Sequence, residues 1–142
     1  MADPFCHKTT TVLAECSRDL KNVLKHHEKG TMITIEGPRF STRAESKMFK
    51  LLGGDLINMT TSPEAPLAKE AGLLYATVAA VTDYDSWRTE GEEVTVEAVL
   101  KIAKENQDKV FELISKAVQK IAAEKWDDTV RRLREEILNS QV

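Results

Sequence analysis

The sequence lacks the features that mark several large classes of protein. It has no excess of positive charge: 20 Lys and Arg stand against 23 Asp and Glu, a net charge of -3, and no basic stripe interleaves with its aromatic residues. This argues against nucleic-acid binding. The longest apolar run, Leu73 to Val81, is about half of the ~20 residues that a membrane-spanning helix needs. The first residues do not form a basic segment followed by a hydrophobic one, so we expect no secretory signal.

Cysteine and histidine are scarce as well. Cys6 and Cys16 lie ten residues apart on one expected helical segment and could not easily meet, so no disulfide framework is expected. This indicates a reducing, cytoplasmic location, with a nuclear one left open. The three histidines, His7, His26 and His27, fall on the same segment and are expected on its solvated face. Without clustered histidines, a metal site is the least favoured interpretation of the acidic residues discussed below.

What is present is an ordinary composition, 42% hydrophobic and 30% charged, in 142 residues, enough chain for one core. Apolar spacing predicts a helix from Lys8 to His27, closed by Lys29-Gly30. Thr95 is expected to cap a long helix to Ala123, followed by a helix from Trp126 to Leu138. The apolar stripe of the long helix is expected to be core: Val96, Val99, Leu100, Ala103, Val110, Leu113, Ile114, Ala117 and Ile121.

Three runs rich in β-branched or apolar residues predict strands: Thr31–Glu36, Asp55–Met59 and Leu73–Val81. The last is nearly continuously apolar, which is typical of a parallel strand buried on both faces. Such a strand needs neighbours on both sides, and three strands make a thin sheet. We predict an α/β fold, with a mostly parallel sheet flanked by helices, in a single partial domain spanning residues 1–142.

Two shorter helices are expected between these strands. Thr42 and Glu45 have the spacing of a capping box, which predicts a helix to about Leu52 that stops at Gly53-Gly54. Thr61 or Ser62 can cap the next helix, with Pro63 at its first position and Gly72 closing it. Strand–helix–strand connections of this kind make right-handed crossovers between parallel strands.

A small polar cluster follows each predicted strand, where ligands bind in open α/β sheets. In the first, Phe40 could stack on a flat ring and Ser41 could bond a polar edge, or the loop could be only a turn. In the second cluster, Met59 and Thr60 precede a helix N-terminus that suits an anion. Alternatively, Met59 is only a buried residue and a hydroxyl only caps the helix. The third carries the carboxylates of Asp83 and Asp85. They either face one ligand or form an Asx turn or cap.

Three motifs, in this order and spacing, make the sequence specific: TIEGPRFSTRAES, GGDLINMTTSPEAPLAKEAG and TDYDSW. Together they resemble the C-terminal half of the 5′-methylthioadenosine phosphorylases, members of the trimeric purine nucleoside phosphorylase family. The similarity runs from Pro4 to about Asn106 and is weaker through the last helices. The resemblance implies phosphorolysis of 5′-methylthioadenosine to adenine and 5-methylthioribose 1-phosphate, a step of purine and methionine salvage. It also implies a homotrimer, phosphate as co-substrate, and no organic cofactor or metal.

The resemblance assigns roles to the residues at matching positions. Phe40 and Ser41 match base-pocket residues, and Asp83 and Asp85 match carboxylates at the adenine edge, with Asp83 the candidate acid that protonates N7. A carboxyl group of ordinary pKa, near ~3.9, holds no proton at neutral pH, so this role requires a desolvated site or a second carboxylate. The remaining matches are Met59 beneath the ribose, Thr60 at the phosphate, and Val96 and Val99 around the 5′-substituent.

The resemblance further predicts that part of the family pattern has no counterpart here. In the family an N-terminal half supplies a Gly-containing phosphate loop, an arginine, a histidine and several central strands. We therefore expect a fragment, a truncated isoform or a partial gene model. The alternatives left open are a catalytically inert α/β fragment or interaction domain, a purine nucleoside phosphorylase of different base specificity, and a nucleosidase that uses water.

Overall fold

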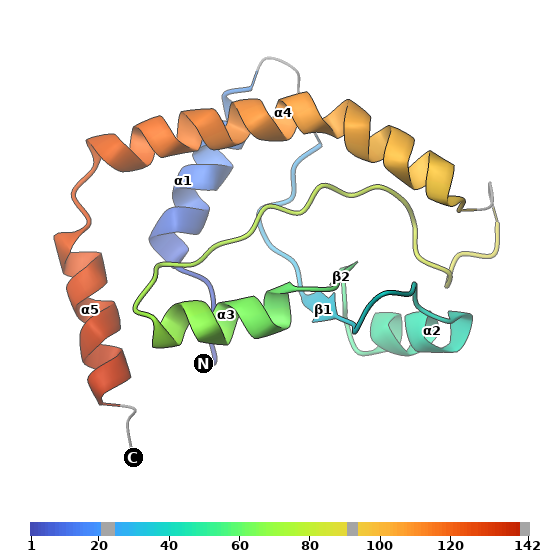
Figure 1. The fold of residues 1–142 in the computed structure, drawn as a ribbon, viewed down its shortest axis with the longest axis horizontal. Coiled ribbons are helices and arrows are strands. Elements are labelled where there is room, and N and C mark those ends of the chain that lie inside the picture. Colours follow the sequence, from blue (N-terminus) through green and yellow to red (C-terminus); the bar gives the residue numbers. More distant parts are fainter. Residues whose placement is uncertain (21–24, 91–93, 140–142) are drawn as a thin grey trace. The chain divides into compact units, whose positions relative to one another are not determined.

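The computed structural model describes residues 1–20, 25–90 and 94–139 (Figure 1). Contacts within the chain group them into two compact units. Unit 1 comprises Met1–Glu28, Pro63–Val78 and Phe111–Val142, and unit 2 comprises Lys29–Ser62 and Ala79–Val110. The prediction of a single partial domain stays a prediction.

Unit 2 is built on a parallel pair of strands. β1 (Met32–Thr34) pairs with β2 (Leu56–Asn58), with Ile33 opposite Ile57. Both predicted strands are therefore confirmed, with narrower bounds. Gly54 lets the Ile33 side chain of β1 pack closely on the backbone just before β2, because a Cβ at this position would lie 2.6 Å from Ile33 Cγ1.

Two helices of the predicted pattern follow these strands. α2 (Arg43–Leu51) begins with the predicted capping box, in which Thr42 and Glu45 bond each other's backbone N–H. α3 (Thr61–Glu70) ends before Gly72, whose φ of 72° is the left-handed conformation that favours glycine. α3 already begins at Thr61, so Pro63 is its third residue and not, as predicted, its first.

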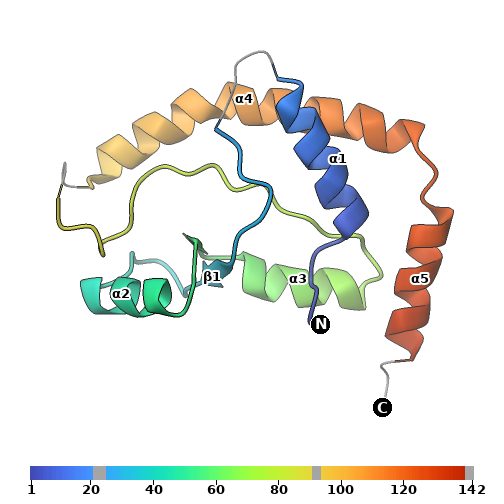
Figure 2. The same cartoon turned by 180° about the vertical axis from the view of Figure 1, so that it is seen from behind.

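The predicted third strand is wrong. Leu73–Val81 has no regular secondary structure, and both views draw it as an extended trace without an arrow (Figures 1 and 2). Tyr75 O accepts a hydrogen bond from Cys6 N (2.7 Å), but in the described part of the chain only β1 and β2 form a sheet. A strand exists only through a ladder with a neighbour, so strand-like composition alone could not produce one here.

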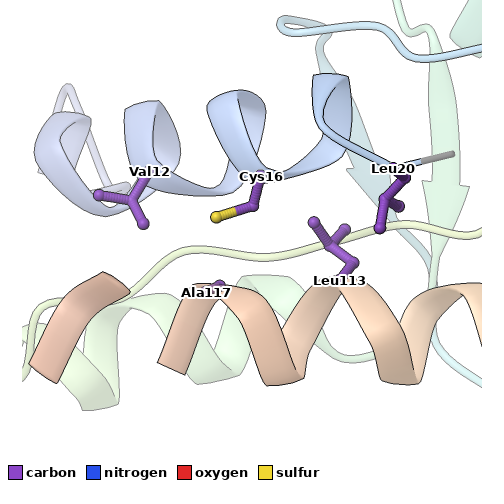
Figure 3. Close-up of a cluster of buried hydrophobic side chains, with 5 residues drawn as sticks. All are labelled: Val12, Cys16, Leu20, Leu113 and Ala117. Atoms are coloured by element: carbon purple, nitrogen blue, oxygen red, sulfur yellow. The ribbon is translucent and has the colours of Figure 1, made fainter. Parts of the chain in front are cut away.

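Unit 1 has a small core between two helices. α1 (His7–Arg18) ends well before the predicted His27; residues 25–27 are not helical, and the predicted residues 21–24 lie outside the described residues. α4 (Val96–Ala123) contributes its C-terminal half to this unit, and α5 (Asp127–Leu138) follows as predicted. Figure 3 shows the buried side chains of the core facing one another: Val12, Cys16 and Leu20 on the α1 side, with Leu113 and Ala117 from α4.

The apolar stripe of α4 is only partly core. Thr95 caps the helix as predicted, since its Oγ1 accepts from Ala98 N (3.2 Å). Leu113 and Ala117 are buried, but Val96 is 61% exposed and Leu100 63%. The expectation that the whole stripe is buried is therefore wrong for Val96 and Leu100 in the N-terminal half of the helix, and also for Ile114, which is 42% exposed in the C-terminal half. None of the helices in the described ranges is both long and apolar enough to cross a membrane.

Candidate functional site

All the site residues proposed from the sequence belong to unit 2, so their surroundings can be described within one compact unit. They are Phe40, Ser41, Met59, Thr60, Asp83, Asp85, Val96 and Val99. Three loops and the first turns of α4 carry them.

The loops after β1 and β2 lie against each other. Ile35 N donates to Asn58 O (2.9 Å), which extends the pairing beyond the strands. A Cβ at Gly37 would lie 3.0 Å from Met59 Sδ, so the Met59 thioether packs on the backbone of the first loop. Only glycine leaves this space without displacing the thioether.

The start of α3 is held by a short polar chain. Thr34 Oγ1 donates to Asn58 Oδ1 (2.8 Å) and accepts from Ser62 N (3.1 Å), and Asn58 Nδ2 donates to the buried Thr61 hydroxyl. These bonds account for Thr61 as a structural residue. The neighbouring Thr60 is exposed, and its hydroxyl has no hydrogen-bond partner in the described structure.

The loop that carries Asp83 and Asp85 is hydrogen-bonded to the loop after β1 and to α2 through the two residues that follow Asp85. Ser86 Oγ donates to Ser41 O (3.2 Å), and Arg43 Nη1 donates to Ser86 O (2.8 Å). Trp87 N donates to the Oγ of Ser46 (2.8 Å), which is only 1% exposed. These bonds bring together the loops that carry Ser41 and the carboxylates, although the segment before the carboxylates is not the strand that the sequence predicts.

Two polar atoms in this region are buried without a hydrogen-bond partner in the described structure: Ser41 Oγ and Asp85 Oδ2. Leaving such atoms unpaired costs about 1–3 kcal/mol each, so native proteins keep few of them. The turn after Asp85 is closed by its backbone, through Arg88 N donating to Asp85 O (3.1 Å). An Asx turn or helix cap therefore does not explain the free carboxylate oxygen.

Asp83 has a different environment. Its side chain is exposed, and Oδ1 accepts from the adjacent Thr82 hydroxyl (2.5 Å). Tyr84, 62% exposed, lies edge-on to Trp87 and carries the Arg88 guanidinium 4.4 Å from its ring centroid. The Asp83 carboxylate thus remains at the surface of the acidic loop.

The other predicted residues are also on the surface. Phe40 is 61% exposed, which leaves a ring face open for stacking. Val96 is equally exposed and Val99 is half-buried, on the first turns of α4. Their role around a 5′-substituent stays a prediction.

An ion pair that the sequence analysis missed holds the first loop. The Arg39 guanidinium donates to both Glu45 carboxylate oxygens (2.9 and 2.6 Å) and to Phe40 O (3.1 Å). These bonds to Arg39, followed by those from Thr42, lower the pKa of Glu45 to about 2, and the pKa of Arg39 is raised in turn. The capping box revealed Glu45 in the sequence, but a six-residue separation gave no signal for Arg39.

Replacing Glu45 by Gln is expected to free the loop after β1 from the ion pair between Arg39 and Glu45. It is also expected to remove the pH dependence of the hydrogen bonds that Glu45 accepts. Since the pKa of Glu45 is lowered from 4.5 in the folded chain, its contribution is present above pH 4.5 and is lost as pH falls toward about 2. The Thr42 amide, whose N donates to Glu45 (2.8 Å), should lose its protection against hydrogen exchange, relative to the intrinsic rate at each pH, over that window in the native chain and should show low protection throughout in Glu45→Gln. The role of Glu45 would be contradicted if the pH dependence of exchange at Thr42 were unchanged in Glu45→Gln. It would also be contradicted if the control variant Glu97→Gln, at an exposed position, lost the protection of Thr42 as well.

Two arginines of unit 2, Arg39 before α2 and Arg43 at its first position, are engaged in hydrogen bonds within the chain. Arg39 is bound to Glu45, and Arg43 is bound to Ser86 O. Among the described residues no group of three His, Cys, Asp or Glu side chains could hold a metal ion.

The parallel strand–helix–strand unit β1–α2–β2, with polar loops after its strands, defines an α/β protein. The family model for the phosphorylase superfamily matches residues 1–119, and the chain belongs to this superfamily. The α/β fold class predicted from the sequence is therefore confirmed.

Individual relatives narrow the similarity. The chain is 51% identical over 134 residues to S-methyl-5′-thioadenosine phosphorylase of Xenopus tropicalis, and 53% identical over 130 residues to that of Danio rerio. These matches cover 94% and 92% of this chain but 47% and 46% of the relatives. The chain therefore spans about half the length of the curated relatives it matches.

A solved structure gives the same result in three dimensions. Methylthioadenosine phosphorylase from Schistosoma mansoni, in complex with adenine, matches with a TM-score of 0.90 at 40% identity. The match covers 99% of this chain and 54% of that one. The resemblance inferred from the three sequence motifs is confirmed.

Proposed function

We propose that this chain supplies the base and ribose side of a site for phosphorolysis of 5′-methylthioadenosine, which yields adenine and 5-methylthioribose 1-phosphate. The observation that carries the proposal is the pair of buried, unpaired atoms, Ser41 Oγ and Asp85 Oδ2, on two loops that are bonded to each other. The names of the relatives support the substrate.

The polar groups fit an aminopurine. The exocyclic amine of adenine is a donor, and a carboxylate such as that of Asp85 is an acceptor only. A 6-oxopurine presents a carbonyl at the same position and would need a donor instead. Phe40 provides an exposed ring on which the base can stack, and Ser41 can donate to or accept from its edge.

The sugar and phosphate would lie toward the second loop. Met59, packed on Gly37, offers a polarisable surface beneath the ribose. Thr60, which directly precedes the N-terminus of α3, would contact phosphate. Val96 and Val99 would give the 5′-substituent an apolar environment, which a methylthio group prefers over a hydroxyl.

In the reaction the bond between C1′ of the ribose and N9 of adenine breaks, and a phosphate oxygen forms the new bond to C1′. Adenine leaves as a neutral molecule if a proton reaches N7 as the bond breaks. Asp83 is the proposed acid once substrate and the rest of the site desolvate its carboxylate, which is exposed in the structure, with Asp85 holding the amine. General acid catalysis of this kind contributes about 10²–10⁴-fold in rate. The cation-like ribosyl group would be stabilised mainly by placement between Met59 and the phosphate.

We further propose that the complete protein acts as a cytoplasmic homotrimer, with phosphate as co-substrate and without a metal or organic cofactor. These proposals rest on the family resemblance. A reducing location also agrees with the two free cysteines, Cys6 and Cys16.

Adenine release tests the function directly. The chain, together with the other half of a relative such as that from Xenopus tropicalis, is incubated with 5′-methylthioadenosine, and free adenine is followed by chromatography. Release that requires phosphate supports phosphorolysis; release at the same rate without phosphate identifies a nucleosidase instead. No release at any phosphate concentration would overturn the proposal.

A second candidate function is that the isolated chain binds the base but does not catalyse the reaction. The residues proposed to contact phosphate favour this candidate. Arg39 and Arg43 are both engaged elsewhere, which leaves Thr60 without a cationic partner in the described structure. The isolated chain is then expected to bind adenine in calorimetry, but to show no saturable binding of phosphate and no turnover. Phosphate-dependent turnover by the chain alone would exclude this candidate.

A further inference from the structure

Ser46 on α2 is a buried polar residue that the proposed site does not include. Its side chain is only 1% exposed. An alanine would fill nearly the same space, so packing alone does not require the hydroxyl. The hydroxyl oxygen accepts a hydrogen bond from Trp87 N (2.8 Å), a backbone group of the acidic loop. Ser46 therefore joins α2 to a segment 41 residues away in the sequence.

Two neighbours of Ser46 on the same face of α2 hold the same segment. Arg43 and Lys50 lie three residues before and four residues after Ser46, so the three side chains share one side of the helix. Arg43 Nη1 donates to Ser86 O (2.8 Å). The Lys50 ammonium group lies 3.2 Å from the centroid of the Trp87 ring. This face of α2 therefore holds two successive residues of the acidic loop.

We propose that Ser46, supported by Lys50, positions the acidic loop so that the Asp85 carboxylate can accept from the amine of adenine. This role rests on the proposed function. Trp87, which Ser46 holds, lies two residues after Asp85, and Asp85 Oδ2 is buried without a hydrogen-bond partner in the described structure. Such an oxygen stays directed at a ligand only if its backbone is held, because a loose loop would turn it toward water. Ser46 is thus a positioning residue that acts through Asp85.

A purely structural role for Ser46 makes a different prediction. In either role, removal of the hydroxyl destabilises the chain, because Trp87 N loses its acceptor. Only the positioning role requires that the effect on adenine binding depends on Asp85. A double-mutant cycle measures this dependence directly.

The test measures adenine affinity and turnover in this chain assembled with the complementary half of the Xenopus tropicalis relative. Ser46→Ala should weaken adenine binding by about tenfold, the size expected when one buried hydrogen bond is lost. The KM for 5′-methylthioadenosine should rise by a similar factor, and the turnover number should fall by less, because Asp85 is proposed to hold the base. Loss of turnover at an unchanged KM would overturn the positioning role.

The double-mutant cycle combines this change with Asp85→Asn. In the Asp85→Asn background, Ser46→Ala should change adenine affinity by less than about twofold, since the carboxylate that Ser46 positions is already absent. The control is Ser115→Ala, the same change at an exposed serine of α4 whose hydroxyl donates to Phe111 O in its own helix (2.8 Å). This control should leave affinity unchanged.

A second variant leaves the buried position intact. Lys50→Met removes the charge above the Trp87 ring and should weaken adenine binding by about threefold, again only while Asp85 is present. Lys50 is exposed, so this variant carries the test if Ser46→Ala does not fold. Circular dichroism of each variant checks its folding.

The outcomes separate the positioning role from the proposed function. An adenine site that depends on Ser46 through Asp85, in an assembly that releases no adenine from 5′-methylthioadenosine, leaves the positioning role standing and overturns the function. Phosphate-dependent release, with an affinity that is insensitive to Ser46 and Lys50 or equally sensitive in the Asp85→Asn background, overturns the positioning role alone. An assembly that binds no adenine overturns both.

Discussion

Replacing Asp83 by Asn is expected to lower adenine release from 5′-methylthioadenosine by about 10²–10⁴-fold, because an amide cannot deliver a proton to N7. The measurement is the turnover number of this chain in complex with the complementary half of a relative. An amide can instead donate to a carbonyl, so the same variant should gain activity on inosine relative to 5′-methylthioadenosine. This shift in preference would not follow from mere loss of structure.

Two further variants make the result specific. Asp85→Asn should raise KM more than it lowers the turnover number, because Asp85 Oδ2 is proposed to hold the amine and not the transferred proton. Asp127→Asn, in the first turn of α5, should be neutral. Full turnover in Asp83→Asn would remove Asp83 from the acid role.

Replacing Leu113 by Ala is expected to destabilise unit 1 by about 2–5 kcal/mol, the usual range for a buried leucine. Leu113 is 5% exposed and lies in the small cluster between α1 and α4, where Val12 and Cys16 also pack (Figure 3). So few residues form this cluster that little else can close the cavity. Urea unfolding followed by circular dichroism measures the change.

Leu100→Ala is the matched control for this loss, since it removes the same atoms from the same helix at a position that is 63% exposed. Its unfolding midpoint should stay close to that of the parent chain. Equal destabilisation by the two variants would mean that the N-terminal half of α4 is as well packed as its C-terminal half.

Features carried by short sequence spacing were predictable. Residues only a few positions apart form the capping box of α2 and the Thr95 cap of α4. A single strand–helix–strand unit forms the parallel pair β1–β2. The loop residues of the site could be named from the same spacing together with the family motifs. Their surroundings could not.

The error at Leu73–Val81 has a different origin. Its apolar composition is typical of a strand with neighbouring strands on both sides. Composition alone does not determine whether those neighbours are present. The exposed half of the α4 stripe has the same cause. In both places the sequence pattern is typical of buried residues, whereas several of these residues are exposed in the structure.

The sequence by itself determined the family, the parallel βαβ unit, and which residues stand at its strand ends, because local spacing and motifs encode them. Only the tertiary structure decided three other things: the Arg39–Glu45 clamp, the unpaired Ser41 and Asp85 atoms, and the bond from Trp87 N to Ser46. Each depends on which distant segments meet. Hydrogen-bond satisfaction and burial are properties of that meeting, not of any single stretch of chain.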